Sequence, residues 1–149
     1  MIVNLKLDLP TEAAFIPIVR RQVDVLLQNM GVSDDDIYRA GMVVTEACSN
    51  VVQHAYSEPG RRYQVELEYY PERLVVTVTD FGTGFDIRSV PEPSPGQIGG
   101  YGIYFIRESA DKVEFGNSGD TGTKVVAEIC LHYQSDEALD FACGLDQDG

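Results

Sequence analysis

The chain has 149 residues and carries 24 acidic against 11 basic side chains, a formal net charge of −13. This length predicts a single main domain with a substantial core, and the negative charge argues against direct binding to nucleic acid or to an anionic membrane. The sequence shows no signal peptide and no apolar run of about 18 residues, so we expect a cytoplasmic protein.

The N-terminal part of the chain is predicted to form one strand and two helices. Apolar and polar residues alternate over residues 1–9, which is the period of a half-buried strand. A helical stripe of apolar residues follows over about 12–30, with Pro17 in the first turn. Ser33 and Asp36 then form a capping box, and three aspartates lie at the positive end of a second helix.

This second helix carries a polar stripe beside an apolar one. Glu46, Asn50 and His54 are four residues apart, so each lies one turn from the next. The neighbouring apolar stripe consists of Ala40, Val44, Ala47, Cys48, Val51 and Ala55. A solvated helix edge and a functional site are both compatible with this polar stripe, and the residues that follow it in the chain decide between them.

Two further strands are predicted as a hairpin over residues 63–70 and 74–80. Side chains alternate between the faces of a strand, so Asp80 shares the covered face with apolar residues of the second strand. A buried carboxylate is costly without a partner, and Asp80 is therefore expected to have one.

The segment from Phe81 to Gly102 has neither a helical nor a strand period. It contains six glycines in two groups, in Asp80-Phe81-Gly82-Thr83-Gly84 and in Gly96 to Gly102, with three prolines between them. A loop of this length is functional or disordered. Glycines just before a helix allow backbone N–H groups to approach phosphates, although a flexible linker is the favoured explanation of each group when it is taken alone.

The C-terminal part is predicted to contain a helix over 103–112 and strands over 113–115 and 123–131. Three amphipathic helices and about five strands predict a two-layer α/β sandwich, with a mixed, mostly antiparallel sheet covered on one face by the helices. The domain is expected to span residues 1–131. Residues 132–149 are acidic and are expected to form a partly disordered tail.

Four short motifs occur in the order that is typical of the histidine-kinase-like ATPase superfamily. They resemble its N box, its two glycine boxes and its closing Gly-Thr, and they are Glu46-x-x-x-Asn50, Asp80-x-Gly82-x-Gly84, Gly100-x-Gly102-Ile103 and Gly122-Thr123. Each motif is weak alone, but the ordered set is specific. Over residues 1–131 the chain is similar to the stand-alone anti-sigma-factor serine kinases of this superfamily, whose fold is a sandwich of the predicted type.

The resemblance implies roles for individual residues in binding ATP and Mg²⁺. Asp80 would accept a hydrogen bond from the exocyclic amine of adenine, supported by Thr123. Asn50 would bind Mg²⁺ through its amide oxygen, and Glu46 would orient and deprotonate the attacking serine hydroxyl. The remaining nucleotide-binding positions would be Gly82, Gly84, Gly100, Tyr101, Gly102 and Ile103.

The resemblance also implies an ATP-dependent protein-serine kinase that acts as an anti-sigma factor. Such a protein would bind a sigma factor, phosphorylate an anti-anti-sigma protein of the STAS type and form a homodimer. The alternative is a non-catalytic, nucleotide-dependent binding protein of the same fold, because residues 89–106 contain no lysine or arginine to meet the phosphates. Lys124 and Arg107 could supply this charge if they reach the site.

Overall fold

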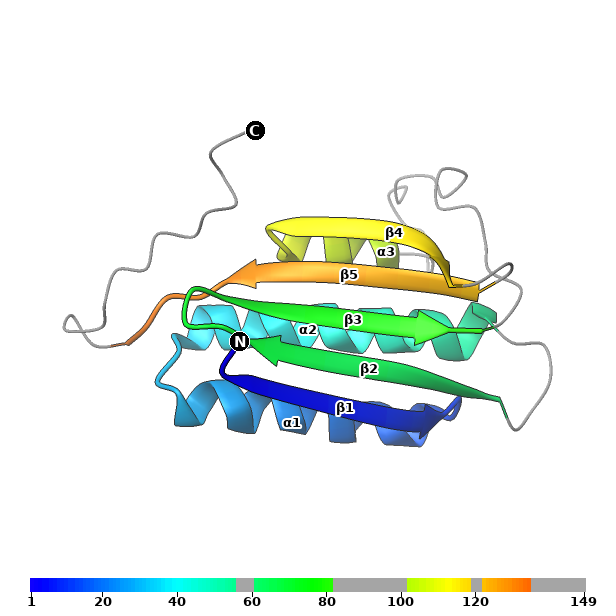
Figure 1. Cartoon of the computed structure of the whole chain (residues 1–149), viewed down its shortest axis with the longest axis horizontal. Helices are drawn as coiled ribbons and strands as arrows, with labels where there is room; N and C mark the ends of the chain where they lie inside the picture. Colours follow the sequence, from blue (N-terminus) through cyan, green and yellow to red (C-terminus); the bar gives the residue numbers. More distant parts are fainter. Residues whose placement is uncertain (56–60, 82–101, 119–121, 135–149) are drawn as a thin grey trace, which may run out of the picture.

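The computed structural model describes residues 1–55, 61–81, 102–118 and 122–134. They form two layers, a sheet and the helices that cover one of its faces (Figure 1). The elements are β1 (Val3–Pro10), α1 (Ile16–Asn29), α2 (Asp34–Asn50), β2 (Arg62–Tyr69), β3 (Arg73–Asp80), α3 (Gly102–Ser109), β4 (Lys112–Ser118) and β5 (Gly122–Cys130). The predicted two-layer α/β sandwich is confirmed.

The five strands lie in the order β1-β2-β3-β5-β4, and each neighbouring pair is antiparallel. Within the described residues the sheet is therefore antiparallel throughout, where the sequence suggested a mixed sheet. The reason is the position of β5, which returns from the β4 hairpin and pairs with β3 in the centre of the sheet. This pairing brings the end of β3 next to the start of β5.

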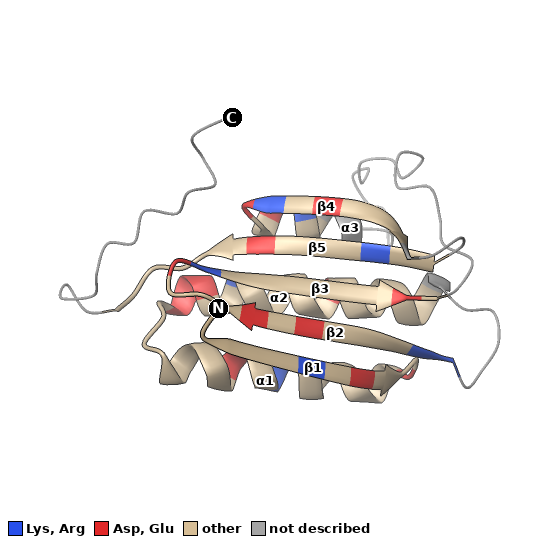
Figure 2. Ribbon diagram, in the orientation of Figure 1, with Lys and Arg blue, Asp and Glu red and all other residues tan. Residues whose placement is uncertain are grey.

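The two faces of the sheet differ in polarity, as the alternation predicts. The covered face is buried against α1 and α2 and includes Tyr63, Val65, Leu67, Leu74, Val76, Val78, Val125, Ala127 and Ile129. The alternate positions lie on the opposite face and are largely polar or charged, and Figure 2 marks the charged residues along the strands. All three lysines of the chain, Lys6, Lys112 and Lys124, belong to this uncovered face.

Pro17 and Ser33 lie at the starts of α1 and α2 as predicted, but the predicted capping box of α2 is only half formed. Pro17 is the second residue of α1, where its missing N–H group breaks no hydrogen bond. The Ser33 hydroxyl caps α2 by accepting a hydrogen bond from the Asp36 N–H group over 3.4 Å. The other half of the predicted capping box is not formed, because the Asp36 carboxylate binds Arg39 at 3.1 Å and accepts the His132 N–H group at 2.6 Å.

A π-helical turn over Val51–Ala55 follows α2 directly. A π turn contains more residues than an α turn. Residues four apart are therefore one turn apart between Glu46 and Asn50, which lie in α2, but not between Asn50 and His54. The polar stripe of α2 therefore consists of Glu46 and Asn50, and the side chain of His54 lies outside the described residues.

The last described residues pack against the domain instead of leaving it. Tyr133 forms an antiparallel bridge with Val32, and its hydroxyl donates to the Pro71 carbonyl over 2.6 Å. The same hydroxyl lies 2.6 Å from the hydroxyl of Tyr69. Burial, followed by the contact with Tyr69, raises the pKa of the Tyr133 hydroxyl above its usual range. Of the predicted tail, residues 135–149 lie outside the described residues.

We expect Tyr133→Phe to lower the free energy of unfolding by about 1–3 kcal/mol, because it leaves the Pro71 carbonyl and the Tyr69 hydroxyl without this partner. Urea denaturation measures the change. Tyr38→Phe is the matched control. Because Tyr38 is 61% exposed, removal of its hydroxyl should change the free energy of unfolding by less than about 0.5 kcal/mol. Equal unfolding midpoints for Tyr133→Phe and the wild type would show that the tyrosine contact does not hold the C-terminal segment.

Candidate functional site

Asp80 and Thr123 meet on the covered face at one end of the sheet. Asp80 is the last residue of β3, and Thr123 is the second residue of the neighbouring strand β5. Both residues are buried, and the Thr123 N–H group donates to the Asp80 Oδ1 atom over 3.3 Å. The buried carboxylate therefore has the partner that its position requires, and two residues far apart in sequence form one polar site.

Tyr63 lies next to this pair, and Cys48 lies next to Tyr63. Tyr63 is directly opposite Asp80 in the β2–β3 register, and both Tyr63 and Cys48 are fully buried. Burial raises the pKa of the Cys48 thiol from 9.0 to about 12, and the nearby Tyr63 hydroxyl acts weakly in the opposite direction. The thiol is thus protonated and inert near neutral pH. Sequence analysis did not assign Tyr63 to the site, although the hairpin register places it beside Asp80.

Glu46 and Asn50 lie in the last two turns of α2, and both are half-buried. This end of α2 lies at the same end of the molecule as the end of β3 and the start of β5 (Figure 1). Within the described part of the chain, neither side chain forms a hydrogen bond or an ion pair. A half-buried carboxylate and an amide without protein partners are available to a ligand.

The helix α3 begins at Gly102, so the first amides of this helix follow the second glycine group directly. The first N–H groups of a helix lack intrahelical acceptors and attract anions. Among the other predicted nucleotide-binding positions, Gly82, Gly84, Gly100 and Tyr101 lie outside the described residues, as does the side chain of Ile103. Their assignments stay predictions.

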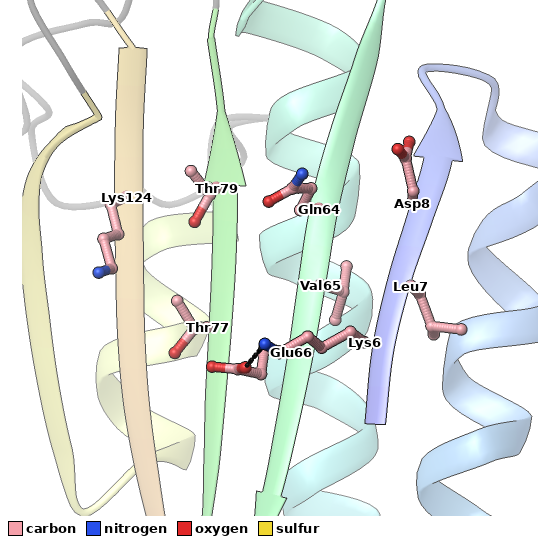
Figure 3. A pocket seen from close by; sticks show the side chains of 9 residues that line it. All are labelled: Lys6, Leu7, Asp8, Gln64, Val65, Glu66, Thr77, Thr79 and Lys124. Carbon is pink, nitrogen blue, oxygen red and sulfur yellow. Dashed lines mark ion pairs between the residues drawn. The ribbon is translucent and has the colours of Figure 1, made fainter. Parts of the chain in front are cut away.

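The two basic residues considered for phosphate binding do not join this site. Lys124 follows Thr123 in β5 and so points to the uncovered face, where it lines a groove of about 440 Å³ with Lys6, Gln64, Thr77 and Thr79 (Figure 3). The sheet separates this groove from Asp80. Arg107 is exposed and lies over the ring of Phe115, with its guanidinium carbon 5.4 Å from the ring centroid.

The described residues contain no cluster of three or more histidine, cysteine, aspartate or glutamate side chains that could hold a metal ion. A single amide oxygen such as that of Asn50 fits Mg²⁺, which keeps several waters and takes phosphate oxygens as ligands. In the same part of the chain, no helix is both long and apolar enough to cross a membrane.

Residues 9–129 of the chain match the family model of the histidine kinase-like ATPase domain. The chain therefore belongs to the histidine kinase-like ATPase family.

Its relatives include serine-protein kinases named RsbW. The chain is 33% identical over 145 residues to RsbW of Halalkalibacterium halodurans, a match that covers 90% of this chain and 86% of the relative. It is 32% identical over 129 residues to RsbW of Bacillus velezensis, with 78% and 81% covered. These similarities group the chain with the RsbW serine-protein kinases.

Solved structures support the same fold. The structure of the RsbU and RsbW domains of a Mycobacterium tuberculosis protein matches with a TM-score of 0.67 at 17% identity, and the match covers 89% of this chain and 34% of that chain. The histidine kinase domain of a blue-light activated kinase from Erythrobacter litoralis matches with a TM-score of 0.51 at 23% identity, covering 83% and 62%.

Proposed function

We propose that this protein is an ATP-dependent serine-protein kinase. The observation that carries the proposal is the placement of Glu46 and Asn50 at the end of the sheet where Asp80 and Thr123 meet, with no hydrogen-bond or ion-pair partner for either side chain among the described residues. The similarity of the chain to RsbW kinases over nearly its full length supports the same activity.

Asp80 is proposed to select adenine. Its carboxylate is an acceptor only, and it suits the exocyclic amine of adenine. The Thr123 N–H group binds Oδ1, which helps to fix the orientation of the carboxylate. The Thr123 hydroxyl supports the same contact. The backbone of Gly82, Gly84, Gly100, Tyr101, Gly102 and Ile103 would surround the rest of the nucleotide.

Glu46 and Asn50 are proposed to serve the phosphate end of the nucleotide. Asn50 would hold Mg²⁺, which, when bound, neutralises charge on the phosphate oxygens. Glu46 would orient the serine hydroxyl of the protein substrate and accept its proton as the bond from the serine oxygen to the γ-phosphorus forms and the bond from that phosphorus to the departing ADP oxygen breaks. Because phosphoryl transfer is loose, orientation is the larger part of this role.

The proposed partners are a sigma factor, which the protein would bind as an anti-sigma factor, and a STAS-type anti-anti-sigma protein, which would supply the serine. A homodimer in the cytoplasm is the proposed state, with residues 1–131 as the functional domain. The names of the RsbW relatives support this assignment at the level of a serine-protein kinase.

One observation favours a second function, a nucleotide-dependent binding protein that transfers no phosphate. Lys124 faces away from Asp80, and Arg107 lies over the Phe115 ring. Lys124 is therefore not positioned to neutralise the phosphates, and Arg107 is engaged with Phe115 instead.

Incubation with labelled ATP, Mg²⁺ and candidate STAS proteins distinguishes these functions. We expect phosphoserine on a STAS protein, identified by mass spectrometry. A wild-type protein that binds a sigma factor in a nucleotide-dependent way, yet forms no phosphoserine with any candidate, would be a binding protein and not a kinase.

A further inference from the structure

Arg39 joins α2 to the far end of α3. Its Nε atom donates to the Ser109 carbonyl over 3.0 Å, and one terminal nitrogen donates to the Asp111 carboxylate over 2.8 Å. The other terminal nitrogen binds Asp36 over 3.1 Å. The guanidinium group thus uses three of its donors on three different residues, while the side chain is 30% exposed.

The two carboxylates that bind Arg39 also hold the end of β5. Asp111 accepts the Cys130 N–H group over 2.7 Å, and Asp36 accepts the His132 N–H group over 2.6 Å. We call Asp36, Arg39, Ser109, Asp111 and the backbone at 130–132 the Arg39 junction. It ties α2, α3 and β5 together at the end of the sheet opposite to Asp80 (Figure 1).

Helix geometry relates this junction to the candidate site. Glu46 is seven residues and Asn50 eleven residues beyond Arg39 in the same unbroken helix. At about 100° per residue these separations fall within roughly 20° of whole turns, so the three side chains form one stripe along α2. Arg39 meets α3 at one end of this stripe, and Asn50 lies at the other end, about 16 Å away.

The helix α3 is a short rigid element between the same two ends. It has eight residues, which is about 12 Å, and runs from Gly102 at the candidate site to Ser109 at the Arg39 junction. A cation that binds a carbonyl of the last turn also interacts favourably with the helix dipole. Loss of the junction would release the Ser109 end of α3 and change the position of Gly102 relative to Asn50.

We propose that Arg39 is a positioning residue for nucleotide binding, which acts by fixing α3 against the stripe of α2 that carries Glu46 and Asn50. This inference rests on the proposed function, because it assumes that nucleotide phosphates lie between the start of α3 and the end of α2. Arg39 itself would not contact the nucleotide.

The test compares Arg39→Gln with Arg73→Gln, with Mg·ATP and ADP affinities measured by calorimetry well below the unfolding temperature. Arg73 is a matched control, since it is 31% exposed and lies near two carboxylates, Glu72 at 3.2 Å and Glu128 at 3.9 Å, neither of which belongs to α3. We expect about a 10-fold loss of affinity for Arg39→Gln, in line with the modest effect that residues outside a site have on binding in it, and wild-type affinity for Arg73→Gln.

Hydrogen exchange without nucleotide provides a second readout. The amides of α3 should exchange faster in Arg39→Gln than in the wild type or in Arg73→Gln. If Arg39→Gln folds poorly, Arg39→Lys replaces it in the test. Lysine keeps the charge but not the planar set of N–H donors, so this variant should also lose nucleotide affinity, by a smaller factor than expected for Arg39→Gln. A folded Arg39 variant with wild-type nucleotide affinity and wild-type exchange in α3 would overturn the positioning role of Arg39 and leave the proposed function intact. A wild-type protein that binds no nucleotide would overturn both.

Discussion

The variant Glu46→Gln should bind Mg·ATP as the wild type does but transfer phosphate to a STAS serine about 10²- to 10⁴-fold more slowly. Glutamine keeps the size of the side chain and most of its hydrogen bonding, but it cannot accept the serine proton. The expected loss is the usual contribution of a positioned general base. Phosphoserine formation and ATP affinity, measured in parallel on the same preparation, check both parts of the result.

Two further variants sharpen this experiment. Asp24→Asn removes another half-buried helical carboxylate, on α1, and should leave transfer unchanged. Asn50→Ala should weaken Mg²⁺-dependent binding and transfer together, because the proposed ligand of the metal is lost. Transfer by Glu46→Gln at the wild-type rate would show that another group is the base, even if the protein is a kinase.

Replacement of Asp80 by alanine should reduce the affinity for ATP and ADP by roughly 10- to 100-fold, or about 1–3 kcal/mol. The adenine amine would then be placed in a largely buried site without its acceptor. Titration calorimetry measures the loss. Thr79→Ala is the control, because Thr79 is the preceding residue of β3 and faces the uncovered side of the sheet.

The base preference of the same site gives an independent check of Asp80. Guanine carries a carbonyl oxygen where adenine carries its amine, so the carboxylate should favour ATP over GTP. Asp80→Asn keeps the shape of the side chain and an acceptor for the Thr123 N–H group but adds a hydrogen-bond donor. This variant should show a smaller preference for ATP over GTP. An Asp80→Ala protein with wild-type ATP affinity would remove Asp80 from the adenine site.

Much of the fold was predictable because each strand has one apolar face. The alternation in Tyr63 to Tyr69 and in Thr123 to Leu131 assigned the covered side chains correctly, and the alternation in residues 74–80 placed Asp80 among them. The same rule would have shown that Lys124, one residue after Thr123, faces the other way. The prediction that Lys124 could reach the phosphates is therefore wrong, because side chains alternate between the faces of a strand.

Other features depend on contacts that a local pattern does not contain. The Arg39 junction joins residues 70 or more positions apart, such as Arg39 with Ser109 and Asp111, and only the packing of α3 on α2 brings them together. Asp36 looked like half of a capping box, but two stronger partners, Arg39 and the His132 backbone, take its carboxylate. The π turn after Asn50 likewise has no clear composition of its own.

The confinement of all three lysines to the uncovered face of the sheet determines how the protein can be labelled. Amine-reactive dyes, crosslinkers and sensor surfaces can react only with Lys6, Lys112, Lys124 and the amino terminus. Coupling through the lysines attaches the molecule by the face that lies across the sheet from Asp80. Protein immobilised in this way presents its helical layer to solution, with Glu46, Asn50 and the start of α3 unmodified.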